Sequence, residues 1–513
     1  MTASRRILLI NPQASPSFWN LERVRSLLGG RPPMCNLALP TLAALVPSGW
    51  EVLLCDEQIQ DLDRILATGP FDVIGLTGYV SQMRRAVTLL ERLREETSAV
   101  LVMGGPAVTL DPELVREKVD VLFFGEAERT WPRFLEELEQ GTYAREYRDK
   151  DPVDLRLAPT PRIDLMPPNA YMTGLVQTGR GCPFSCEFCD IVVMFGRQMR
   201  SKMPPAVVRE LEGWHQQGYR MTFLADDNFI GNKRQAIAMM EAIRDWQQQR
   251  PEEERMALFT QASINLSRDA QLLGLAREAN LTEVFVGIES PNASALSGAG
   301  KMQNVRTDLL QSVHTLQRHG LIVSAGMIVG FDEDGPGIFE QQLEFLQAAG
   351  IPVVMAGQLY ALAGTPLAER LEHEGRLLPT ISGVKATYNS NFEPKQMSRQ
   401  TLAEGHWWLV QELYRAENFL PRLQVLLNNL PQEEGRRGVP PAWQLEAMAA
   451  VADSFKPLSA DARHVRKLLM QAMKNHPRHA LSLGQILLYF RDMQKMMAQG
   501  PLKALGAWGA QAV

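Results

Sequence analysis

The chain has 513 residues, which at roughly 150 residues per domain predicts about three domains. Hydrophobic residues make up 45 % and charged residues 22 %, a globular mixture that excludes a fibrous or disordered protein. A formal net charge of −5 does not indicate a nucleic-acid partner, and five cysteines are too few for a disulfide scaffold. We expect no secretory leader, because only four apolar residues follow the arginines near the N-terminus, and no run reaches the roughly 18 apolar residues that would span a bilayer. We therefore expect a cytoplasmic enzyme of several domains.

Short apolar runs alternate with helix-compatible stretches in the first part of the chain. The runs cover 6–11, 51–56, 72–77, 100–104 and 120–125. Such runs are typical of a parallel sheet covered on both faces, and ligands bind at the carboxyl ends of its strands. The residues expected there as ligand contacts are Asn11, Glu57, Thr77, Gly78, Gly104, Gly105, Gly125 and Glu126. Taken alone, these residues fit ordinary turns of an α/β domain equally well.

Three of the five cysteines form a C-x3-C-x2-C array, Cys182, Cys186 and Cys189, directly after an apolar segment at 171–178. Three thiolates on one loop can hold three irons of a 4Fe–4S cluster and leave the fourth iron open to another ligand. A zinc site would need a fourth Cys or His nearby, and the next histidine, His215, comes 26 residues later in a predicted helix. The array therefore indicates an iron–sulfur cluster rather than zinc.

Strands and helices alternate again after the cysteine array. The predicted strands are 171–178, 221–225, 257–263, 283–288, 321–329 and 353–361, and the helices between them include 203–217, 233–249 and 336–349. Six such units predict an incomplete TIM-type barrel with its chemistry at the carboxyl ends of the strands. The acidic turn at 226–228 follows the second strand, where a helix N-cap is an equally good interpretation.

The last part of the chain, from about residue 390, has a helical pattern. Between Lys456 and Val513 there are nine Lys and Arg but two Asp and Glu, together with Met470, Met473, Met493, Met496 and Met497. A basic, methionine-rich tail could make peripheral contact with a membrane or a lipid-like substrate. A capping helical bundle with a solvated basic face explains the same pattern, and His464, His476 and His479 are expected on its surface.

The segment 160–375 resembles the radical S-adenosylmethionine (SAM) superfamily, on the sequence GRGCPFSCEFCD and on Gly326–Glu333, which matches the element Gly-x-Ile-x-Gly-x-x-Glu. The resemblance implies that the open iron chelates SAM, which is cleaved to a 5′-deoxyadenosyl radical. It implies SAM contacts for Phe188, Asp226, Ser263, Glu289, Ile328 and Gly330. The cations Arg197, Arg200 and Lys202 could neutralise the SAM carboxylate or the cluster, or be solvated.

The first part of the chain resembles the cobalamin-binding domain of methyltransferases and mutases, whose pattern is Asp-x-His-x-x-Gly, Ser-x-Leu and Gly-Gly. The matching segments are Asp56–Asp61, Thr77–Tyr79 and Gly104–Gly105, and Gly104 comes 27 positions after Thr77. Gln58 stands at the histidine position. The resemblance therefore implies a cobalamin without a histidine lower ligand from its own domain, and a domain that no longer binds cobalamin is the alternative.

The order of the three parts resembles the cobalamin-dependent radical SAM enzymes nearly end to end, in particular the hopanoid and bacteriochlorophyll C-methylases. This resemblance rests on GCPFSCEFCDI, DDNFIGNK, GIESP and VGFDED. The expected fold is α/β: a Rossmann-like cobalamin-binding domain at 1–145, a partial (βα)6 TIM-type radical SAM barrel at 160–378 and an α-helical domain at 390–513.

The implied reaction transfers a methyl group from methylcobalamin to an unactivated carbon after the radical has removed a hydrogen atom. The implied substrate is a small molecule, an apolar polycycle or a tetrapyrrole, and the implied electron donor is a flavodoxin or ferredoxin. A cyclisation, ring contraction or rearrangement with the same cofactors is the main alternative. A cobalamin carrier without enzymatic activity is disfavoured, because the cysteine array would then have no use.

Overall fold

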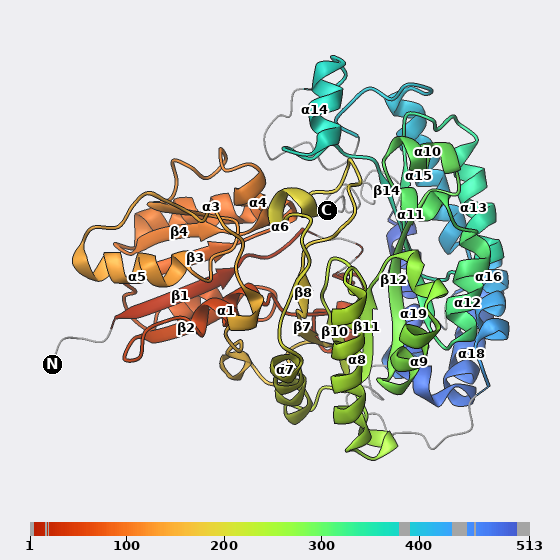
Figure 1. Ribbon diagram of the computed structural model, residues 1–513, viewed down its shortest axis with the longest axis horizontal. Coiled ribbons are helices and arrows are strands. Elements are labelled where there is room, and N and C mark those ends of the chain that lie inside the picture. The colour runs from red at the N-terminus through yellow and green to blue at the C-terminus, as the bar shows by residue number, and fades with distance from the viewer. Residues whose placement is uncertain are drawn as a thin grey trace.

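Two six-stranded parallel sheets organise the molecule, with strand orders β2-β1-β3-β4-β5-β6 and β14-β13-β12-β11-β10-β7. The computed structural model describes residues 5–15, 18, 20–378, 390–432, 449–455 and 458–499. Figure 1 shows the first sheet on the left, the second on the right and the C-terminal helices on the outer side of the second. The expected α/β class, with a helical C-terminal part, is confirmed.

The first sheet contains β1 (Arg6–Asn11), β2 (Glu51–Asp56), β3 (Val73–Thr77), β4 (Val100–Gly104), β5 (Val121–Phe124) and β6 (Glu146–Arg148). Its helices include α3 (Met83–Glu96) and α5 (Thr130–Gln140). Alternate residues of β1 enter different cores: Ile7 and Leu9 belong to one cluster, Leu8 and Ile10 to another. The strand is therefore buried on both faces, which is why it reads as a continuous apolar run.

The second sheet contains β7 (Gly174–Val176), β10 (Met221–Leu224), β11 (Ala257–Gln261), β12 (Leu281–Glu289), β13 (Ile322–Val329) and β14 (Val354–Gln358). Its covering helices include α7 (Pro204–Gln216), α8 (Lys233–Gln248), α9 (Ala270–Glu278), α12 (Leu309–Arg318) and α13 (Ile338–Ala349). Strands β14 and β7 are its two edges, so the barrel is open as predicted. Strand β7 is shorter than expected because Met172 and Thr173 donate to the carbonyls of Pro32 and Pro33 instead of to β10.

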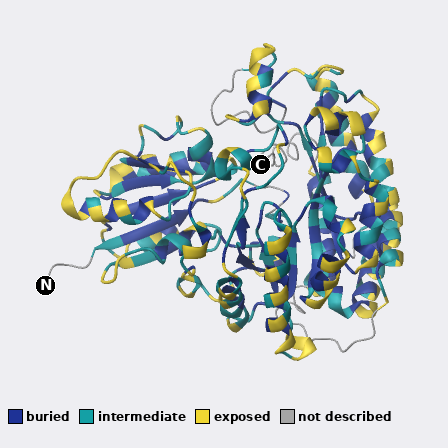
Figure 2. Ribbon diagram, in the orientation of Figure 1, coloured by how far each residue is buried: buried dark blue, intermediate teal, exposed yellow. Residues whose placement is uncertain are grey.

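The second sheet has one fully buried face and one half-buried face. Along β12, Val284 and Val286 are completely buried, whereas Phe285 is half-buried. The buried face packs beneath α9 and α12, so the half-buried residues line the inner side of the open barrel. In Figure 2 the strands are mostly buried, and the exposed residues lie on the surrounding helices and loops. On this side the rings of Phe223 and Phe259 stack with centroids 4.6 Å apart. The inner face is therefore an aromatic surface.

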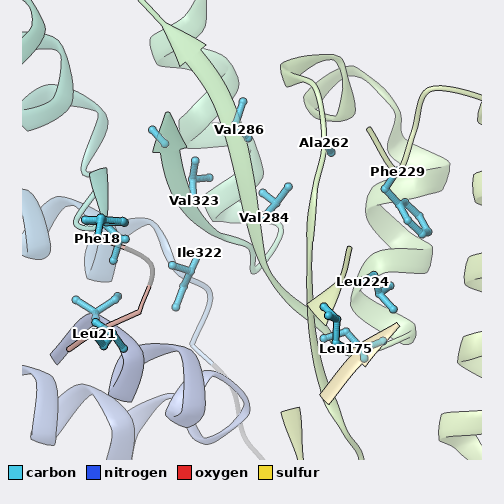
Figure 3. Packing of buried hydrophobic residues seen from close by; sticks show 14 of the residues in the cluster. Phe18, Leu21, Leu175, Leu224, Phe229, Ala262, Val284, Val286, Ile322 and Val323 are labelled. Atoms are coloured by element: carbon cyan, nitrogen blue, oxygen red, sulfur yellow. The ribbon is translucent and has the colours of Figure 1, made fainter. Parts of the chain in front are cut away.

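Four long helices form the C-terminal part: α15 (Arg399–Tyr414), α16 (Ala416–Asn429), α18 (Ala460–Asn475) and α19 (Ala480–Met497). Helix α19 reaches the amino ends of the barrel strands, where the hydroxyls of Ser482 and Thr282 lie 3.0 Å apart. Tyr489 of α19 also stacks on Phe18 of the N-terminal segment, with centroids 4.9 Å apart. Figure 3 shows Phe18 beside the start of β13. The helices and the N-terminal segment thus close this end of the barrel.

The methionine-rich tail packs inward rather than facing solvent. Met473, Met493 and Met496 are buried, and Met470 and Met497 pack against the same core. The expectation that His476 and His479 lie on the surface is wrong, since both are buried and His479 bonds to the carbonyl of Gly320 at 2.7 Å. The described part of the tail therefore presents no methionine surface to a membrane, while residues 500–513 of that tail lie outside the described residues. No helix in the described ranges is both long and apolar enough to cross a membrane.

Glu283 predicts a pH dependence of stability. It lies at the start of β12, where the Ser324 hydroxyl donates to its carboxylate at 2.7 Å and burial raises its pKa to about 7. Between the usual glutamate pKa and this value the folded state holds more protons than the unfolded state, so stability falls as pH rises, by about 3 kcal/mol in all. Glu283→Gln should flatten this fall, measured as the thermal unfolding midpoint at about pH 5 and about pH 8. Glu253→Gln, at an exposed position, should follow the unmodified protein; a Glu283→Gln profile that also follows it would contradict this account.

Candidate functional site

The cysteine array forms a loop between β8 (Gly179–Arg180) and α6 (Ile191–Phe195). Side-chain amides approach two of its sulfurs: Asn228 Nδ2 lies 3.9 Å from Cys182 Sγ, and Gln303 Nε2 lies 3.8 Å from Cys186 Sγ. Amide donors of this kind suit thiolates that carry the negative charge of an iron–sulfur cluster. Among the described residues, no three His, Cys, Asp or Glu side chains converge as ligands of a single metal ion. The fit to a cluster therefore rests on three thiols of one loop and the amides directed at them.

The acidic turn at 226–228 fastens the cysteine loop to the barrel. Asp226 accepts from the backbone of Thr178 at 2.7 Å and of Gly179 at 2.9 Å, and Asp227 accepts from Gly181 at 2.7 Å. The helix N-cap interpretation of this turn is wrong, because Asn232 caps α8. Both oxygens of Asp226 accept from protein donors, so its side chain positions the loop from which Cys182 projects.

Glu289 ends β12 in an unusual backbone conformation and forms a buried ion pair. Its φ is +66°, at an irregularity in the pairing of β12 with β13. Lys301 Nζ donates to Glu289 Oε1 at 2.6 Å and lies 5.9 Å from the centroid of the Phe188 ring. Burial, the largest single influence, lowers the pKa of Lys301, but the charge and hydrogen bond of Glu289 together with the nearby Cys186 and Cys189 outweigh it, so the pKa is raised. A Cβ at Gly287 would overlap the Glu289 carboxylate and lie 2.9 Å from Nζ, so the pair requires glycine there.

The predicted SAM contacts on β13 lie close to this ion pair. Gln342 of α13 donates to the carbonyl of Ile328 at 2.7 Å and to that of Glu289 at 3.3 Å, which joins the ends of β12 and β13. Gly330 has a φ of +105° and donates to Asp334 at 2.9 Å. Phe188 lies against the same end of the sheet, with its ring 5.9 Å from that of Phe331.

Ser263 lies at the end of β11, where its backbone donates to Asn228 Oδ1 at 3.1 Å. Apart from Phe188 in the cysteine loop, the residues that the resemblance assigns to SAM thus lie at the carboxyl ends of the four neighbouring strands β10 to β13.

The cobalamin residues predicted on the first sheet also gather at the carboxyl ends of its strands. Asn11 is buried, donates to Asp56 at 3.1 Å and accepts from Gln82 at 2.8 Å. Glu57 receives the guanidinium of Arg85 at 2.5 Å. These contacts fix the ends of β1 and β2.

The Gly104–Gly105 turn brings two loops of the first sheet into close approach. Gly105 has a φ of +100°, and a Cβ there would lie 2.7 Å from Thr77 Oγ1 and 3.0 Å from the Gly78 nitrogen. Gly125 also has a positive φ, and its backbone donates to Thr109 at 2.9 Å. Only glycine at 105 therefore allows this close approach of the two loops, which we call the cradle, at the edge of the sheet where ligands bind.

Gly105→Ala should therefore impair cobalamin binding. The added methyl group would displace the loop of Thr77 and Gly78, and we expect cobalamin affinity to fall at least about tenfold while the cluster still forms. Titration of the anaerobic protein with cobalamin, followed by its visible absorbance, measures the effect. Gly141→Ala is the matched control, since Gly141 also has a positive φ but no atom near its Cβ position. Equal affinities for the two variants would contradict the cradle.

A buried charge network joins the two sheets beside the cysteine loop. Arg180 pairs with Glu126 and Glu128, each at 2.6 Å, and Arg200 pairs with Glu126 at 2.8 Å. Burial would raise the pKa of Glu126, but Arg200 and Arg180 outweigh it and lower the pKa. The carboxylate of Glu126, a predicted ligand contact, is therefore paired with Arg180 and Arg200 of the second part of the chain.

The three cations after the cysteine loop have different surroundings. Besides Arg200 in the network, Lys202 forms a buried pair with Glu210 at 2.6 Å, so neither is a solvated surface cation. Arg197 is exposed and donates to the carbonyl of Pro183 at 3.2 Å.

The carboxyl ends of the two sheets face each other across this network. Helix α4 (Pro106–Leu110), which begins after Gly105, contacts α6 of the cysteine loop, and α6 lies between the sheets in Figure 1. Tyr79 and Val80 follow β3 and are 52 % and 45 % exposed, and Tyr79 lies within electrostatic range of Asp227. An exposed aromatic at this edge is a candidate contact for a corrin face.

Several residues of the site carried no signal in the sequence. Lys301 and Gln342 lie outside the recognised motifs, and Tyr79 appeared only as the third residue of a weak match. The contacts of Arg180 and Glu126 could not be foreseen, because nothing in a single sequence pairs two charges 54 residues apart.

Comparison with known proteins agrees with this arrangement. The chain matches the B12 binding domain over residues 31–135, the Radical SAM superfamily over 176–373 and a domain of unknown function, DUF4070, over 365–499. An uncharacterised methyltransferase of Synechocystis sp. is 35 % identical over 81 % of this chain and 77 % of its own length. The hopanoid C-2 methylase of Rhodopseudomonas palustris is 31 % identical over 73 % of this chain and 71 % of its own.

Solved structures share the fold along the whole chain. The radical SAM methyltransferase TsrM from Kitasatospora setae, solved with cobalamin and a 4Fe–4S cluster, has a TM-score of 0.65 at 15 % identity and covers 97 % of this chain and 100 % of its own. The cobalamin-dependent radical SAM enzyme OxsB, with aqua-cobalamin and SAM bound, has a TM-score of 0.63 at 16 % identity, over 98 % of this chain and 80 % of its own. These structures share the fold, and the B12-binding and radical SAM matches together with the methyltransferase relatives above 30 % identity establish that the chain belongs to the cobalamin-dependent radical SAM methyltransferases.

Proposed function

We propose that the protein methylates an unactivated carbon of an apolar small molecule, a polycyclic compound or a tetrapyrrole. The observation that supports this most is the meeting of the two strand-end edges, with the exposed Tyr79 on one and the cysteine loop on the other. The aromatic inner face around Phe223, Phe259 and Phe285 supports the apolar substrate. Relatives point the same way, among them a bacteriochlorophyllide d C-12(1)-methyltransferase of Chlorobaculum tepidum, 23 % identical over 76 % of this chain.

In this proposal Cys182, Cys186 and Cys189 hold the cluster, and Lys301 binds the SAM carboxylate. Lys301 has three donors and Glu289 occupies one of them, so the ammonium can bind a second carboxylate without losing the first. When bound, the cluster and SAM supply a 5′-deoxyadenosyl radical and cobalamin supplies the methyl group.

The other assigned residues shape the space around these groups. Phe188, Ile328 and Gly330 provide an apolar wall for adenine beside the end of β13. The glycines Gly78, Gly104 and Gly105 expose backbone to cobalamin at the ends of β3 and β4. The stacked phenylalanines of the inner face exclude water, which protects a carbon radical from side reactions.

The cellular setting follows from the same chemistry. All five cysteines are free thiols, and a thiolate-held cluster needs a reducing compartment. We therefore expect the protein to work in the cytoplasm, with electrons supplied by a flavodoxin or ferredoxin.

A radical cyclisation is the second candidate. An anaerobic magnesium-protoporphyrin IX monomethyl ester cyclase of Synechocystis sp. is 25 % identical over 66 % of this chain. Such a reaction could use the same two cofactor sites but would leave the carbon count of the substrate unchanged.

Product mass separates the two candidates. Anaerobic protein loaded with cluster and cobalamin is incubated with a reductant, SAM labelled with deuterium in its methyl group, and a tetrapyrrole or hopanoid extract. Methylation predicts a product that carries the labelled methyl group, with S-adenosylhomocysteine and 5′-deoxyadenosine formed in equal amounts. A product of unlabelled mass, formed with 5′-deoxyadenosine alone, would replace the methylase proposal by the cyclase.

A further inference from the structure

A cavity of about 360 Å³ opens on the molecular surface beside the cysteine loop. It lies between that loop and the segments that follow β11 and β12. We define the arginine face by six residues around this cavity: Ser185, Arg197, Arg268, Met302, Gln303 and Arg306.

The arginines of this face carry charge that the described residues do not neutralise. Arg197, Arg268 and Arg306 are exposed, and no ion pair with an Asp or Glu of the described ranges involves any of them. Arg268 donates to the carbonyl of Arg306 at 2.5 Å and Arg197 to that of Pro183 at 3.2 Å, so backbone contacts hold two of the guanidinium groups in place. The whole chain has a net charge of −5, so this face is a local positive area on an acidic protein.

The arginine face adjoins the position of the cluster. Gln303, a member of the face, directs its amide to Cys186 Sγ at 3.8 Å. Ser185, another member, immediately precedes Cys186, and a Cβ at Gly300 would lie 3.1 Å from the Ser185 carbonyl, so Gly300 packs directly against the cysteine loop. The exposed Met302 adds an apolar contact at the rim.

We propose that the arginine face docks an acidic protein that donates single electrons to the cluster. The radical SAM reaction consumes one electron per cleaved SAM, and Cys35 and Cys55, both buried in the first part of the chain, are too few to hold a relay cluster of their own. The electron therefore enters from outside. The donor is oxidised by one electron, the cluster is reduced by one electron, and no bond forms or breaks at this face. Complementary charge on a face that adjoins Cys186 orients such a donor and speeds its encounter.

The test uses a purified flavodoxin as the donor and the protein loaded with cluster and cobalamin. Binding of oxidised flavodoxin is measured by calorimetry for the unmodified protein, for Arg268→Glu/Arg306→Glu, and for the control Arg318→Glu/Arg463→Glu. The control changes two exposed arginines on α12 and α18 and gives the same change in net charge.

We expect the Arg268/Arg306 variant to lower flavodoxin affinity at least about tenfold and the control less than about twofold, with the difference fading at high salt. Cleavage of SAM driven by dithionite should be equal in all three proteins, whereas cleavage driven by reduced flavodoxin should fall in the Arg268/Arg306 variant alone.

Three results would overturn the proposal. Equal weakening in both variants would show an effect of net charge only, and unchanged binding in the Arg268/Arg306 variant would remove the face as the docking site. A loss of dithionite-driven cleavage would instead show that the cavity serves SAM or substrate.

Discussion

Cys186→Ala should abolish formation of 5′-deoxyadenosine, to below about one-thousandth of the unmodified rate. Cys186 is buried, and its sulfur receives the Gln303 amide, so alanine removes one of three cluster ligands and the partner of that amide. Two remaining thiolates cannot hold the cluster with one open iron. The measurement is chromatographic quantification of 5′-deoxyadenosine from anaerobically reconstituted protein, together with iron and cobalamin content.

The control for this prediction is Cys55→Ala, which removes another buried thiol outside the loop. We expect Cys55→Ala to keep cluster and activity, and Cys186→Ala to lose iron but keep cobalamin, because the cobalamin contacts lie on the first sheet. Retained cleavage in Cys186→Ala would refute the assignment of the loop.

Lys301→Met should weaken SAM binding by about tenfold to a hundredfold, the range for loss of a charge-assisted contact. The same variant leaves Glu289 buried without its partner, which costs about 3–5 kcal/mol of stability. These two effects must be separated, because a poorly folded variant would also fail to bind SAM.

The double variant Lys301→Met/Glu289→Gln separates them. It removes the unpaired charge, so the thermal midpoint should recover relative to Lys301→Met, while SAM affinity measured by calorimetry should stay low. Glu289→Gln alone retains the ammonium and should bind SAM more tightly than the double variant. Recovery of SAM affinity together with stability in the double variant would show that Lys301 has a structural role only.

The strands could be predicted from the sequence because buried and half-buried strands both consist mainly of apolar residues, which appear as short apolar runs. All six strands of the second sheet and five of the first coincide with predicted runs. Strand β6, Glu146–Arg148, was missed because its pattern is exposed, buried, exposed and Tyr147 alone enters the core. The tail was harder to interpret, because basic and methionine residues occur in buried helices as well as on membrane-facing ones. Its buried histidines belong to the closure of the barrel, which depends on contacts between distant segments.

The site could be predicted only where residues lie close in sequence. The spacing of the three cysteines is enough to predict a cluster site, and two consecutive glycines are enough to predict a turn with exposed backbone at Gly104–Gly105. The acidic turn at 226–228 was recognised as important, but its function of holding the cysteine loop depends on backbone donors more than 45 residues away. The pair of Lys301 with Glu289 and the network around Glu126 likewise depend on contacts between residues that are separated in the sequence.

Electron paramagnetic resonance of the reduced protein tests the central claim most directly. The claim is that the cysteine loop leaves one iron of the cluster without a protein ligand, so that SAM binds there. Protein reconstituted without oxygen and reduced should show the signal of a reduced 4Fe–4S cluster, and added SAM should change that signal. A protein that binds zinc instead, or a cluster signal that is the same with and without SAM, would contradict the account.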